Sequence, residues 1–518
     1  MTESLAASDT ATPSLLSHRQ IIILMLTLGT GMLLAALDQT IVATALPTIV
    51  GDLGGLNHLS WVVSAYLLTS TVSAPLYGKV SDQLGRKVVF QFAVVTFLVG
   101  SALAGASQNL NELIATRALQ GLGAGGIMAI ALAIVGEVVS PRQRGRYMGY
   151  FGAVFALSSV AGPLLGGFFV DHASWRWVFY VNLPLGVLSL IVTQIVLRVP
   201  FARHPHRTDY LGATFLVAAM SSLLLVAVWG GTQYPWSSPT ILLLTAVGAV
   251  LTVVFAVHER RAAEPILPPR LFRQRVFTAS SSLSFLVGFV MFGAIVFLPV
   301  YFQLVRGVSA TMSGIDILPM VLGMLTTSIA SGRLVTRRNR YRIFPIVGTV
   351  VIAVGLFLLS RLAVSTSYIT LSLYLVVLGA GLGLVMQILV LAVQNAADPA
   401  DLGTVTSSST FFRSMGAAFG TGIFGAILSS RLTSYFAARS PGLHLSTSTL
   451  SASPQRVRAL PAPIRQLVVN GFMHALHDVF LSALPLAVLA VVLALVLPEI
   501  PLRDHPLSPV EATADLAL

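Results

Sequence analysis

Long apolar runs dominate this sequence of 518 residues. A run of about 20 apolar residues is long enough for a helix to cross a hydrocarbon core roughly 30 Å thick. Because a backbone inside lipid must satisfy its hydrogen bonds internally, repeated runs of this length predict an all-α polytopic membrane protein. Charged or Pro- and Gly-rich breaks separate fourteen predicted spans: 21–46, 59–79, 88–106, 111–138, 146–170, 177–198, 209–230, 240–258, 277–303, 310–335, 343–361, 367–394, 403–430 and 475–497.

The composition supports this class and excludes several kinds of chemistry. Charged residues make up 10% of the chain, against about 25% in a typical soluble domain. The chain has no cysteine, so it has no disulfide, no thiolate zinc site and no cysteine nucleophile. It also lacks an HExxH helix and a Gly-x4-Gly-Lys-Ser/Thr loop. No metal, no ATP site and no other cofactor is therefore expected, and the chain is not predicted to be an enzyme.

The placement of arginine gives the expected orientation. Basic residues cluster in alternate breaks between spans, and the cytoplasmic loops of membrane proteins collect Lys and Arg. The net charge of +12 is therefore interpreted as topology, and no nucleic-acid partner is expected. Both termini are assigned to the cytoplasmic side of the cell (cytoplasmic or inner) membrane. The N-terminus is polar with almost no basic region, so no cleaved signal peptide is expected.

One connection between predicted spans does not follow this distribution of basic residues. Residues 431–470 are expected outside the membrane yet contain five arginines. Long loops translocate largely regardless of their charge. The Ser- and Pro-rich stretch SPGLHLSTSTLSASPQ predicts a flexible external loop, and a role in docking a partner remains an alternative.

The two halves of the chain show a weak internal sequence repeat. The sequence YGKVSDQLGRK follows the second span, and SGRLVTRRNRYR follows the tenth. Internal repetition of this kind is typical of secondary transporters. The predicted organisation is a cytoplasmic tail (1–20), an N-terminal six-helix bundle (21–198), two linking helices with a cytoplasmic loop (199–275), a C-terminal six-helix bundle (276–497) and a cytoplasmic tail (498–518).

The loop after the second span carries a pattern of small and charged residues. Gly78 would let another helix approach closely. Asp82 and Arg86 can pair in a tight turn opened by Gly85. Glu137, at the cytoplasmic end of the fourth span, can pair with Arg86 in the same network. We interpret these residues as a conformational latch whose opening would favour one orientation of the protein.

Four further stretches complete a family pattern: LDQTIVATALP (37–47), LIATRALQGLG (113–123), AGPLLGG (161–167) and WRWVFYVNLPLG (175–186). Together with the loop after the second span, they resemble the fourteen-span drug:proton antiporter family of the major facilitator superfamily. The resemblance covers nearly the whole chain. It implies a fold of two six-helix bundles plus two inserted central helices. It also implies transport driven by the proton motive force, without a cofactor.

The stretch AGPLLGG looks like the motif associated with exporters rather than importers. Its residues Gly162, Pro163, Gly166 and Gly167 are expected to kink the fifth span and to thin its surface. Ordinary packing of small residues is the alternative interpretation.

The function predicted from this resemblance is proton-coupled export of lipophilic or cationic small molecules, as in multidrug efflux and antibiotic resistance, by alternating access. The expected partners are the lipid bilayer, protons and the small-molecule substrates; a periplasmic adaptor is left open. Alternatives are a dedicated exporter of an endogenous lipid or secondary metabolite, a proton-coupled nutrient importer, and a membrane sensor without transport.

Asp38 stands in the middle of the first apolar span. A charge at bilayer depth costs about 2.5–3.5 kcal/mol on insertion scales, so it usually has a partner. With a rise of about 1.5 Å per residue, Asp38 and Arg117 of the fourth span lie at comparable depth. We predict that they interact, directly or through Gln120 or water, in a cavity that the first and fourth helices of the resembled fold both line. The predicted role is proton coupling, and a purely structural ion pair is the alternative.

Asp316 and Arg413 also fall inside predicted spans. Asp316, in the outer half of the tenth span, is a second candidate for proton coupling; binding a cationic substrate or lying at a solvated rim are the alternatives. Pro319 nearby is expected to free backbone carbonyls. Arg413, deep in the thirteenth span, needs an anion, and the sequence names none.

The substrate cavity is expected between the first, fourth, ninth and twelfth spans. Its candidate lining residues are Gln39, Gln120, Phe285, Phe289, Phe292, Tyr374, Gln387 and Arg413. Aromatic side chains on membrane helices also serve in packing or face lipid, and this alternative applies to each of them.

Overall fold

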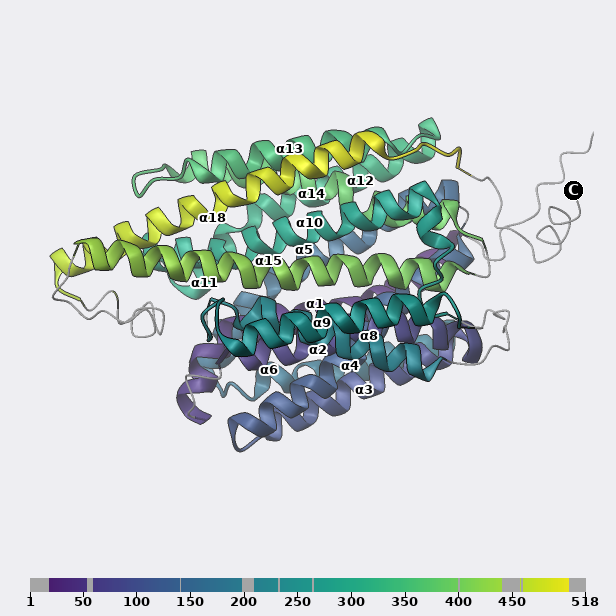
Figure 1. The fold of residues 1–518 in the computed structure, drawn as a ribbon, viewed down its shortest axis with the longest axis horizontal. Helices are drawn as coiled ribbons and strands as arrows, with labels where there is room; N and C mark the ends of the chain where they lie inside the picture. The colour runs from purple at the N-terminus through teal and green to yellow at the C-terminus, as the bar shows by residue number, and fades with distance from the viewer. Residues whose placement is uncertain are drawn as a thin grey trace, which may run out of the picture.

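A computed structural model describes residues 18–53, 59–139, 141–197, 209–231, 233–262, 265–398, 401–439, 457 and 460–502. The helices lie side by side in one elongated bundle (Figure 1). Within the described ranges, thirteen helical segments are long and apolar enough to cross a membrane. The only strand-like pairing in those ranges is an isolated bridge between Gly230 and Tyr234. The prediction of an all-α polytopic membrane protein is confirmed.

The first six predicted spans correspond to seven helices. They are α1 (His18–Leu53), α2 (Leu59–Leu84), α3 (Arg86–Ala106), α4 (Leu110–Val138), α5 (Pro141–His172), α6 (Trp177–Tyr180) and α7 (Asn182–Val196). The two central spans are α8 (Tyr210–Trp229) and α9 (Pro239–Glu259).

The last six predicted spans correspond to the rest of the helices. They are η2 (Leu271–Arg273), α10 (Arg275–Val300), η3 (Tyr301–Val305), α11 (Ala310–Asp316), α12 (Leu318–Arg338), α13 (Ile343–Ser360), α14 (Tyr368–Ala396), α15 (Leu402–Arg439) and α18 (Ala462–Val496).

The helix α2 is the one predicted span that is not among the thirteen apolar segments. It packs against α4, α15 and α8, so its polar side chains have partners inside the bundle. Ser73, for example, donates to the carbonyl of Leu122 in α4 at 3.1 Å. A hydroxyl bonded to a neighbouring helix in this way is tolerated where lipid is excluded.

Two predicted spans are broken where proline removes a backbone donor. The sixth span divides into α6 and α7 at Val181, because Pro184 cannot donate to the carbonyl of Tyr180. The tenth span divides into α11 and α12 at Ile317, because Pro319 cannot donate to the carbonyl of Ile315. The expectation that proline would free carbonyls next to Asp316 is not borne out at Ile315, whose carbonyl accepts from the amide of Ile317.

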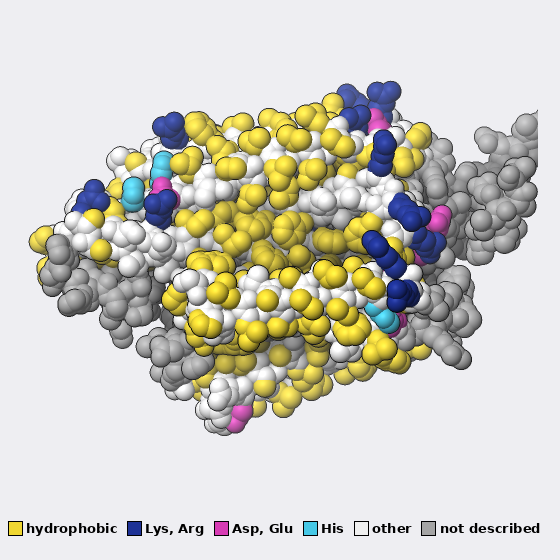
Figure 2. Space-filling view, viewed as in Figure 1, with side chains coloured by type: hydrophobic (Ala, Val, Ile, Leu, Met, Phe, Trp, Pro, Cys, Tyr) yellow, Lys and Arg dark blue, Asp and Glu magenta, His cyan; other side chains and the backbone are white. Residues whose placement is uncertain are grey.

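The two halves of the chain meet along a few helices. Helix α5 packs along α11 and α12, and α2 packs along α15. The central helix α8 contacts both α2 and α15, so the inserted pair lies against the seam between the halves (Figure 1). Basic side chains gather most densely at the end of the bundle where α10 begins and α18 ends (Figure 2).

Close contacts join the halves at this arginine-rich end. Gly78 of α2 faces Ser407 of α15 so closely that a Cβ atom on Gly78 would collide with the Ser407 side chain. Gln394 of α14 donates to the carbonyl of Leu132 in α4 at 3.1 Å. The seam is therefore closed at the arginine-rich end, and Gly78 permits the approach that the sequence predicted.

A tyrosine fixes the end of the chain to the same end of the bundle. The Tyr341 hydroxyl donates to the carbonyl of Pro498 at 2.9 Å and accepts from the amide of Ile500 at 3.3 Å. Burial raises the pKa of the Tyr341 phenol to about 12. The phenol is therefore neutral at physiological pH and keeps both hydrogen bonds.

The loop predicted at 431–470 is shorter than expected. Helix α15 continues to Arg439, and α18 begins at Ala462. Leu432 and Phe436 are buried, with Phe436 packed against Gly471 of α18, and Arg431 pairs with Asp478 at 3.0 Å. The hydropathy pattern missed this extension because arginines interrupt the apolar residues. The stretch SPGLHLSTSTLSASPQ, on which the prediction of flexibility rested, lies outside the described residues.

We predict that Gly78→Ala opens the seam at the arginine-rich end, because the added Cβ has no room against Ser407. The chain has no cysteine, so spin labels can be placed on exposed Leu84 and Arg337, one in each half, without a background signal. Their distance distribution is expected to gain a population at larger separation. Gly425→Ala is the matched control, since its Cβ would make only an ordinary contact at 3.9 Å. An unchanged distribution in Gly78→Ala would contradict this prediction.

Candidate functional site: a buried charge cluster

Asp38 of α1 and Arg117 of α4 form an ion pair inside the N-terminal bundle. The Arg117 guanidinium donates to Asp38 Oδ2 at 2.5 Å. Asp38 is 0% exposed and Arg117 is 1% exposed. The predicted interaction between these two residues is therefore present, and it is direct.

Amide side chains complete the hydrogen bonding of the carboxylate. Asp38 Oδ1 accepts from Gln120 Nε2 at 2.8 Å and from Asn182 Nδ2 at 2.9 Å. Ser101 of α3 accepts from both amides, at 3.1 and 3.0 Å, and donates to the carbonyl of Phe179 at 2.8 Å. The carboxylate thus has three charged or polar donors, which offset the cost of taking it out of water.

The guanidinium is held by groups other than Asp38 as well. Arg117 donates to Gln120 Oε1 at 2.7 Å and more weakly to the carbonyl of Val62 at 3.4 Å. Its Cζ lies 4.2 Å from the centre of the Tyr66 ring, and the Tyr66 hydroxyl donates to the carbonyl of Ala35 at 3.2 Å. A cation over an aromatic face is further stabilised when both are buried. We call Asp38, Ser101, Arg117, Gln120, Asn182 and Tyr66 the charge cluster.

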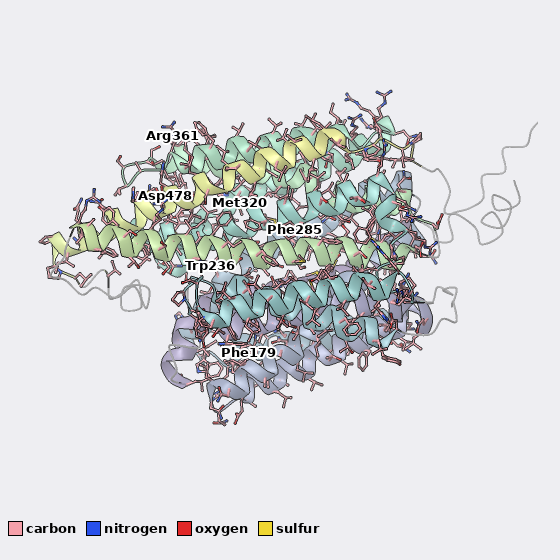
Figure 3. The ribbon with its side chains drawn as sticks, in the orientation of Figure 1. Phe179, Trp236, Phe285, Met320, Arg361 and Asp478 are labelled. Carbon is pink, nitrogen blue, oxygen red and sulfur yellow. The ribbon has the colours of Figure 1, made fainter. Side chains whose placement is uncertain are left out.

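The charge cluster is closed to solvent in this conformation. Its residues come from α1, α2, α3, α4 and α7, all within the N-terminal half. Figure 3 places Phe179, which covers one side of the cluster, in that half and away from Phe285 of the C-terminal half. The pair does not face an open cavity in this conformation, because side chains and a carbonyl of α2, α4 and α7 supply its polar partners. The expectation of a cavity between α1 and α4 that opens and closes stays a prediction.

Sequence reasoning missed three members of the cluster. Asn182 lies within the stretch WRWVFYVNLPLG, and its signal was a lone amide inside an apolar run. Ser101 and Tyr66 carried no signal of their own, since single Ser and Tyr residues are common in membrane helices. Their role depends on how α2 and α3 pack around α4, which spacing along the chain does not give.

Asp316 ends α11 next to the proline break and is 7% exposed. Its side chain is therefore largely shielded from solvent in this conformation. Arg306 is near enough to interact electrostatically with it, although Arg306 itself donates to the carbonyl of Thr366 at 2.5 Å. No hydrogen bond or ion pair to the Asp316 carboxylate occurs within the described residues. A buried carboxylate without a close cation is suited to exchanging a proton or binding a cation.

The predicted latch is seen only in part. Gly85 has φ 95°, a conformation that favours glycine, and it opens α3 in the tight turn that was expected. Arg86 is buried and donates to Ser81 Oγ. The side chains of Asp82 and Glu137 lie outside the described residues, so their pairing with Arg86 stays a prediction.

The AGPLLGG stretch brings α5 close to two other helices. A Cβ atom on Gly162 would collide with Thr40 of α1, whose hydroxyl donates to the carbonyl of Ser158 at 2.9 Å. On the other face of α5, Pro163 packs against Gly314 of α11, in the C-terminal half. The motif therefore packs α5 against its own half and against the opposite half at once. A kink at Pro163 stays a prediction.

Further glycines of this stretch extend both contacts. A Cβ atom on Gly166 would lie 3.2 Å from the Thr44 side chain of α1, and one on Gly167 would lie 2.9 Å from the Thr311 side chain of α11. Small residues at these positions let the helix backbones approach closely.

The candidate lining residues of the substrate cavity divide into packed and accessible groups. Phe289 is 7% exposed and packs edge-to-face on Phe424 at 5.2 Å, so it belongs to the core of the C-terminal bundle. Gln120 belongs to the charge cluster. Gln387 is buried, and its Oε1 has no hydrogen-bond partner in the described part of the chain. The half-buried candidates are Gln39, Phe285, Phe292, Tyr374 and Arg413.

Arg413 of α15 has a contact across the seam. Its Cζ lies 6.0 Å from the centre of the Phe155 ring of α5, in the other half. No acidic partner for Arg413 occurs within the described residues. The anion that the sequence called for is therefore not supplied by the part of the chain that the structure describes.

Comparison with known proteins identifies the family of this chain. The family model of the Major Facilitator Superfamily matches residues 28–421. This chain belongs to that superfamily. It is 46% identical to an uncharacterized MFS-type transporter of Mycobacterium tuberculosis, over 92% of this chain and 69% of the relative. It is 39% identical to the multidrug transporter protein MdtP of Bacillus subtilis, over 91% of this chain and 92% of that protein.

A solved structure gives the same fold. The human organic anion transporter MFSD10 (TETRAN) aligns with a TM-score of 0.63 over 91% of this chain and 99% of its own, at 18% sequence identity. This likeness concerns the fold alone. The protein is a multi-pass major facilitator transporter, and its family and structural neighbours are transporters rather than enzymes. Within the described residues, no group of three or more His, Asp or Glu side chains is placed to hold a metal ion.

We predict that Asp38→Asn destabilises this transporter by about 3–5 kcal/mol, because it leaves the buried Arg117 guanidinium without an anion. The midpoint of chemical unfolding in detergent measures the change. The matched control is Asp478→Asn, whose partner Arg431 is 58% exposed, and this change is expected to cost about 0–1 kcal/mol. Equal losses in the two variants would contradict the assignment of a buried, mutually dependent pair.

Proposed function

We propose that this protein is a proton-coupled exporter of lipophilic or cationic small molecules that works by alternating access. The observation that carries the proposal is the Asp38–Arg117 pair, a carboxylate and its counter-ion buried at membrane depth. Buried ionisable residues in membrane helices mark ion or proton pathways. The multidrug name of the Bacillus subtilis relative supports export of small molecules. No cofactor is involved in this proposal, and the proton motive force supplies the energy.

The charge cluster contains an oxygen atom that could accept a hydrogen bond from a protonated Asp38. Asn182 donates to Asp38 through Nδ2, while its Oδ1 has no hydrogen-bond partner within the described residues. A neutral Asp38 carboxyl group needs an acceptor for its own hydrogen. Rotation of the Asn182 amide would supply Oδ1 at that point. Protonation would remove the charge attraction to Arg117, which would then rely on Gln120, the Val62 carbonyl and the Tyr66 ring.

Alternating access would control when the proton enters. The seam is closed at the arginine-rich end through Gly78 with Ser407 and Gln394 with Leu132. We assign this end to the cytoplasm, since cytoplasmic loops collect arginine. The cluster would then exchange protons after a rearrangement of the N-terminal bundle admits water. Only a proton that binds two conformations with different affinity can bias their equilibrium.

Asp316 is the second proposed proton or cation site. It is buried at a helix break, where the C-terminal end of α11 and a carboxylate together suit a cation. The substrate would lie between the halves against the half-buried residues Gln39, Phe285, Phe292 and Tyr374, with Arg413 and the buried Gln387 as polar contacts. Phe289 is not proposed in this role because it packs within its own bundle.

Proton release in proteoliposomes tests this proposal. The purified protein is reconstituted with an imposed pH gradient, and a panel of lipophilic cations and neutral amphiphiles is added. The wild type is expected to dissipate the gradient when a substrate is present. Asp38→Asn is expected to lose this response at least tenfold, while it still exchanges labelled substrate across the membrane without a gradient. Retained exchange shows that the variant is folded and binds substrate.

Asp478→Asn is the matched control and is expected to behave as the wild type, since its ion pair with Arg431 is solvent-exposed. Dissipation by Asp38→Asn at the wild-type rate would make the pair purely structural. If a substrate is exchanged but never dissipates the gradient in the wild type, coupling to protons is wrong. If no panel compound is exchanged at all, a dedicated endogenous product replaces the multidrug substrates of this proposal.

A further inference from the structure

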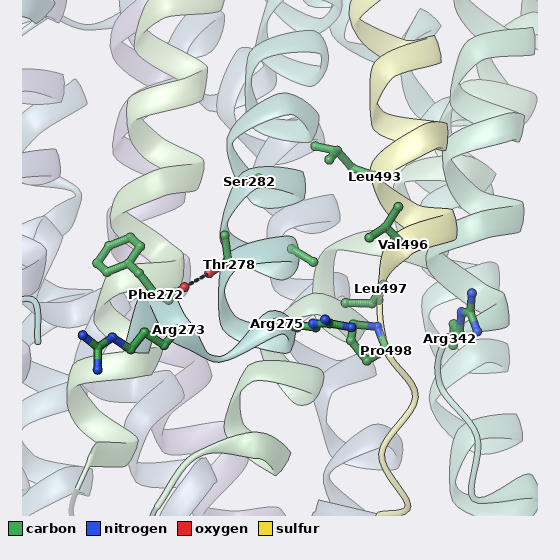
Figure 4. Close-up of a pocket in the computed structure, with 11 residues that line it drawn as sticks. Phe272, Arg273, Arg275, Thr278, Ser282, Arg342, Leu493, Val496, Leu497 and Pro498 are labelled. Atoms are coloured by element: carbon green, nitrogen blue, oxygen red, sulfur yellow. Dashed lines mark hydrogen bonds between the residues drawn. The ribbon is translucent and has the colours of Figure 1, made fainter. Parts of the chain in front are cut away.

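A groove of about 570 Å³ opens at the arginine-rich end of the bundle, outside the charge cluster and the seam (Figure 4). It lies where η2 and the start of α10 face the end of α18. Three of its lining residues are arginines, two are aliphatic residues of α18 and one is the leucine that follows α18: Arg273, Arg275, Arg342, Leu493, Val496 and Leu497. The groove is therefore lined by basic residues, and one of its walls is apolar.

The arginines of the groove have spare hydrogen-bonding capacity. Arg273 and Arg275 are exposed, and neither has an acidic or hydrogen-bonding partner within the described residues. Arg342 donates from one terminal nitrogen to the carbonyl of Leu495 at 2.6 Å, while its Nε is buried without a partner. Figure 4 shows Arg275 and Arg342 on the side of the groove next to Pro498, whereas Arg273 extends away from them. A guanidinium group binds phosphate with two parallel hydrogen bonds, so Arg275 and Arg342 form an available anion site.

Hydrogen bonds fix the segments that form the two sides of the groove. Thr278 of α10 donates to the carbonyl of Phe272, at 2.8 Å, which fixes η2 against the start of α10. On the opposite side, the Tyr341 hydroxyl bonds to the carbonyl of Pro498 and fixes the segment after α18. Figure 4 shows Arg275 extending toward Pro498, with Leu493 and Val496 above it along α18. Both walls are thus held in place by hydrogen bonds.

The apolar wall is expected to meet the hydrocarbon region of the membrane at Val496. This residue is 66% exposed, and α18 is long and apolar enough to cross a membrane. A ligand that fills the groove must therefore be anionic at one end and hydrocarbon at the other. A free phosphate ion would leave the aliphatic wall uncovered, whereas a phospholipid would cover both parts. Basic pockets between membrane helices at a membrane surface bind anionic lipid headgroups.

We propose that this groove binds one anionic phospholipid of the adjacent leaflet. Its phosphate lies between Arg275 and Arg342, and one acyl chain lies along Leu493 and Val496. The inference does not depend on proton coupling or on the identity of the transported substrate. A bound lipid here would hold the beginning of α10 to the end of α18, two helices that pack together in the C-terminal bundle.

Native mass spectrometry of the full-length protein in detergent tests the proposal. The protein is mixed with phosphatidylglycerol and phosphatidylcholine of identical acyl chains in equal amounts, and the lipid that stays bound is counted. The wild type is expected to retain phosphatidylglycerol at least fivefold over phosphatidylcholine. Arg273→Gln/Arg275→Gln is expected to reduce this preference to below twofold. Both side chains are exposed and without partners within the described residues, so the double variant is expected to fold.

The matched control is Arg337→Gln/Arg338→Gln, which removes the same charge from exposed positions at the same end of the bundle. It is expected to keep the wild-type preference. An equal loss in both variants would mean that general surface charge, not this groove, selects the lipid, and would overturn the proposal. Equal retention of the two lipids by the wild type would also overturn it. Added glycerol 3-phosphate is expected to leave the bound lipid in place; displacement at millimolar concentration would identify a site for soluble phosphates instead.

Discussion

The ion pair between Asp38 and Arg117 constrains how the helices of the N-terminal bundle pack. Two charges taken out of water cost several kcal/mol each, and their attraction alone offsets this only with good geometry and further hydrogen bonds. Gln120 and Asn182 supply those bonds to the carboxylate, and the Tyr66 ring covers the guanidinium. Since these partners come from different helices, the pair fixes how several helices pack around α1 and α4. A transporter that uses this carboxylate for protons must therefore move helices to reach it.

The contacts between the halves are suited to such movement. They depend on small residues that let helices approach without interlocking: Gly78 against Ser407, and Pro163 against Gly314. Contacts of this kind are lost with little desolvation cost when helices separate. The C-terminal bundle is packed differently, with large aromatic residues such as Phe289 and Phe424 in edge-to-face contact. We infer that each bundle moves largely as a body and that the seam between them opens, as in the alternating-access motion of transporters built from repeats.

Much of the fold was predictable because lipid imposes simple rules. Apolar length gave the spans, and glycine gave the turn at Gly85. The helix break beside Asp316 was not predicted, because the apolar run continues through Pro319. Depth along the helix was enough to pair Asp38 with Arg117, because few other residues of opposite charge lie at that depth in the apolar spans. The roles of Ser101 and Tyr66 were not predictable, since they depend on the rotation of α2 and α3 about their axes. The extension of α15 to Arg439 was missed because arginines interrupt its apolar residues.

The proton-coupling role of Asp38 is tested most directly by infrared difference spectroscopy of the protein in lipid membranes, with substrate added at successively lower pH. A protonated carboxyl group gives a C=O band that a carboxylate lacks. If Asp38 takes up the coupled proton, this band appears in the wild type as the pH falls and is missing from Asp38→Asn. If the same band appears at full intensity in Asp38→Asn, the proton is carried elsewhere and the buried pair with Arg117 is structural only.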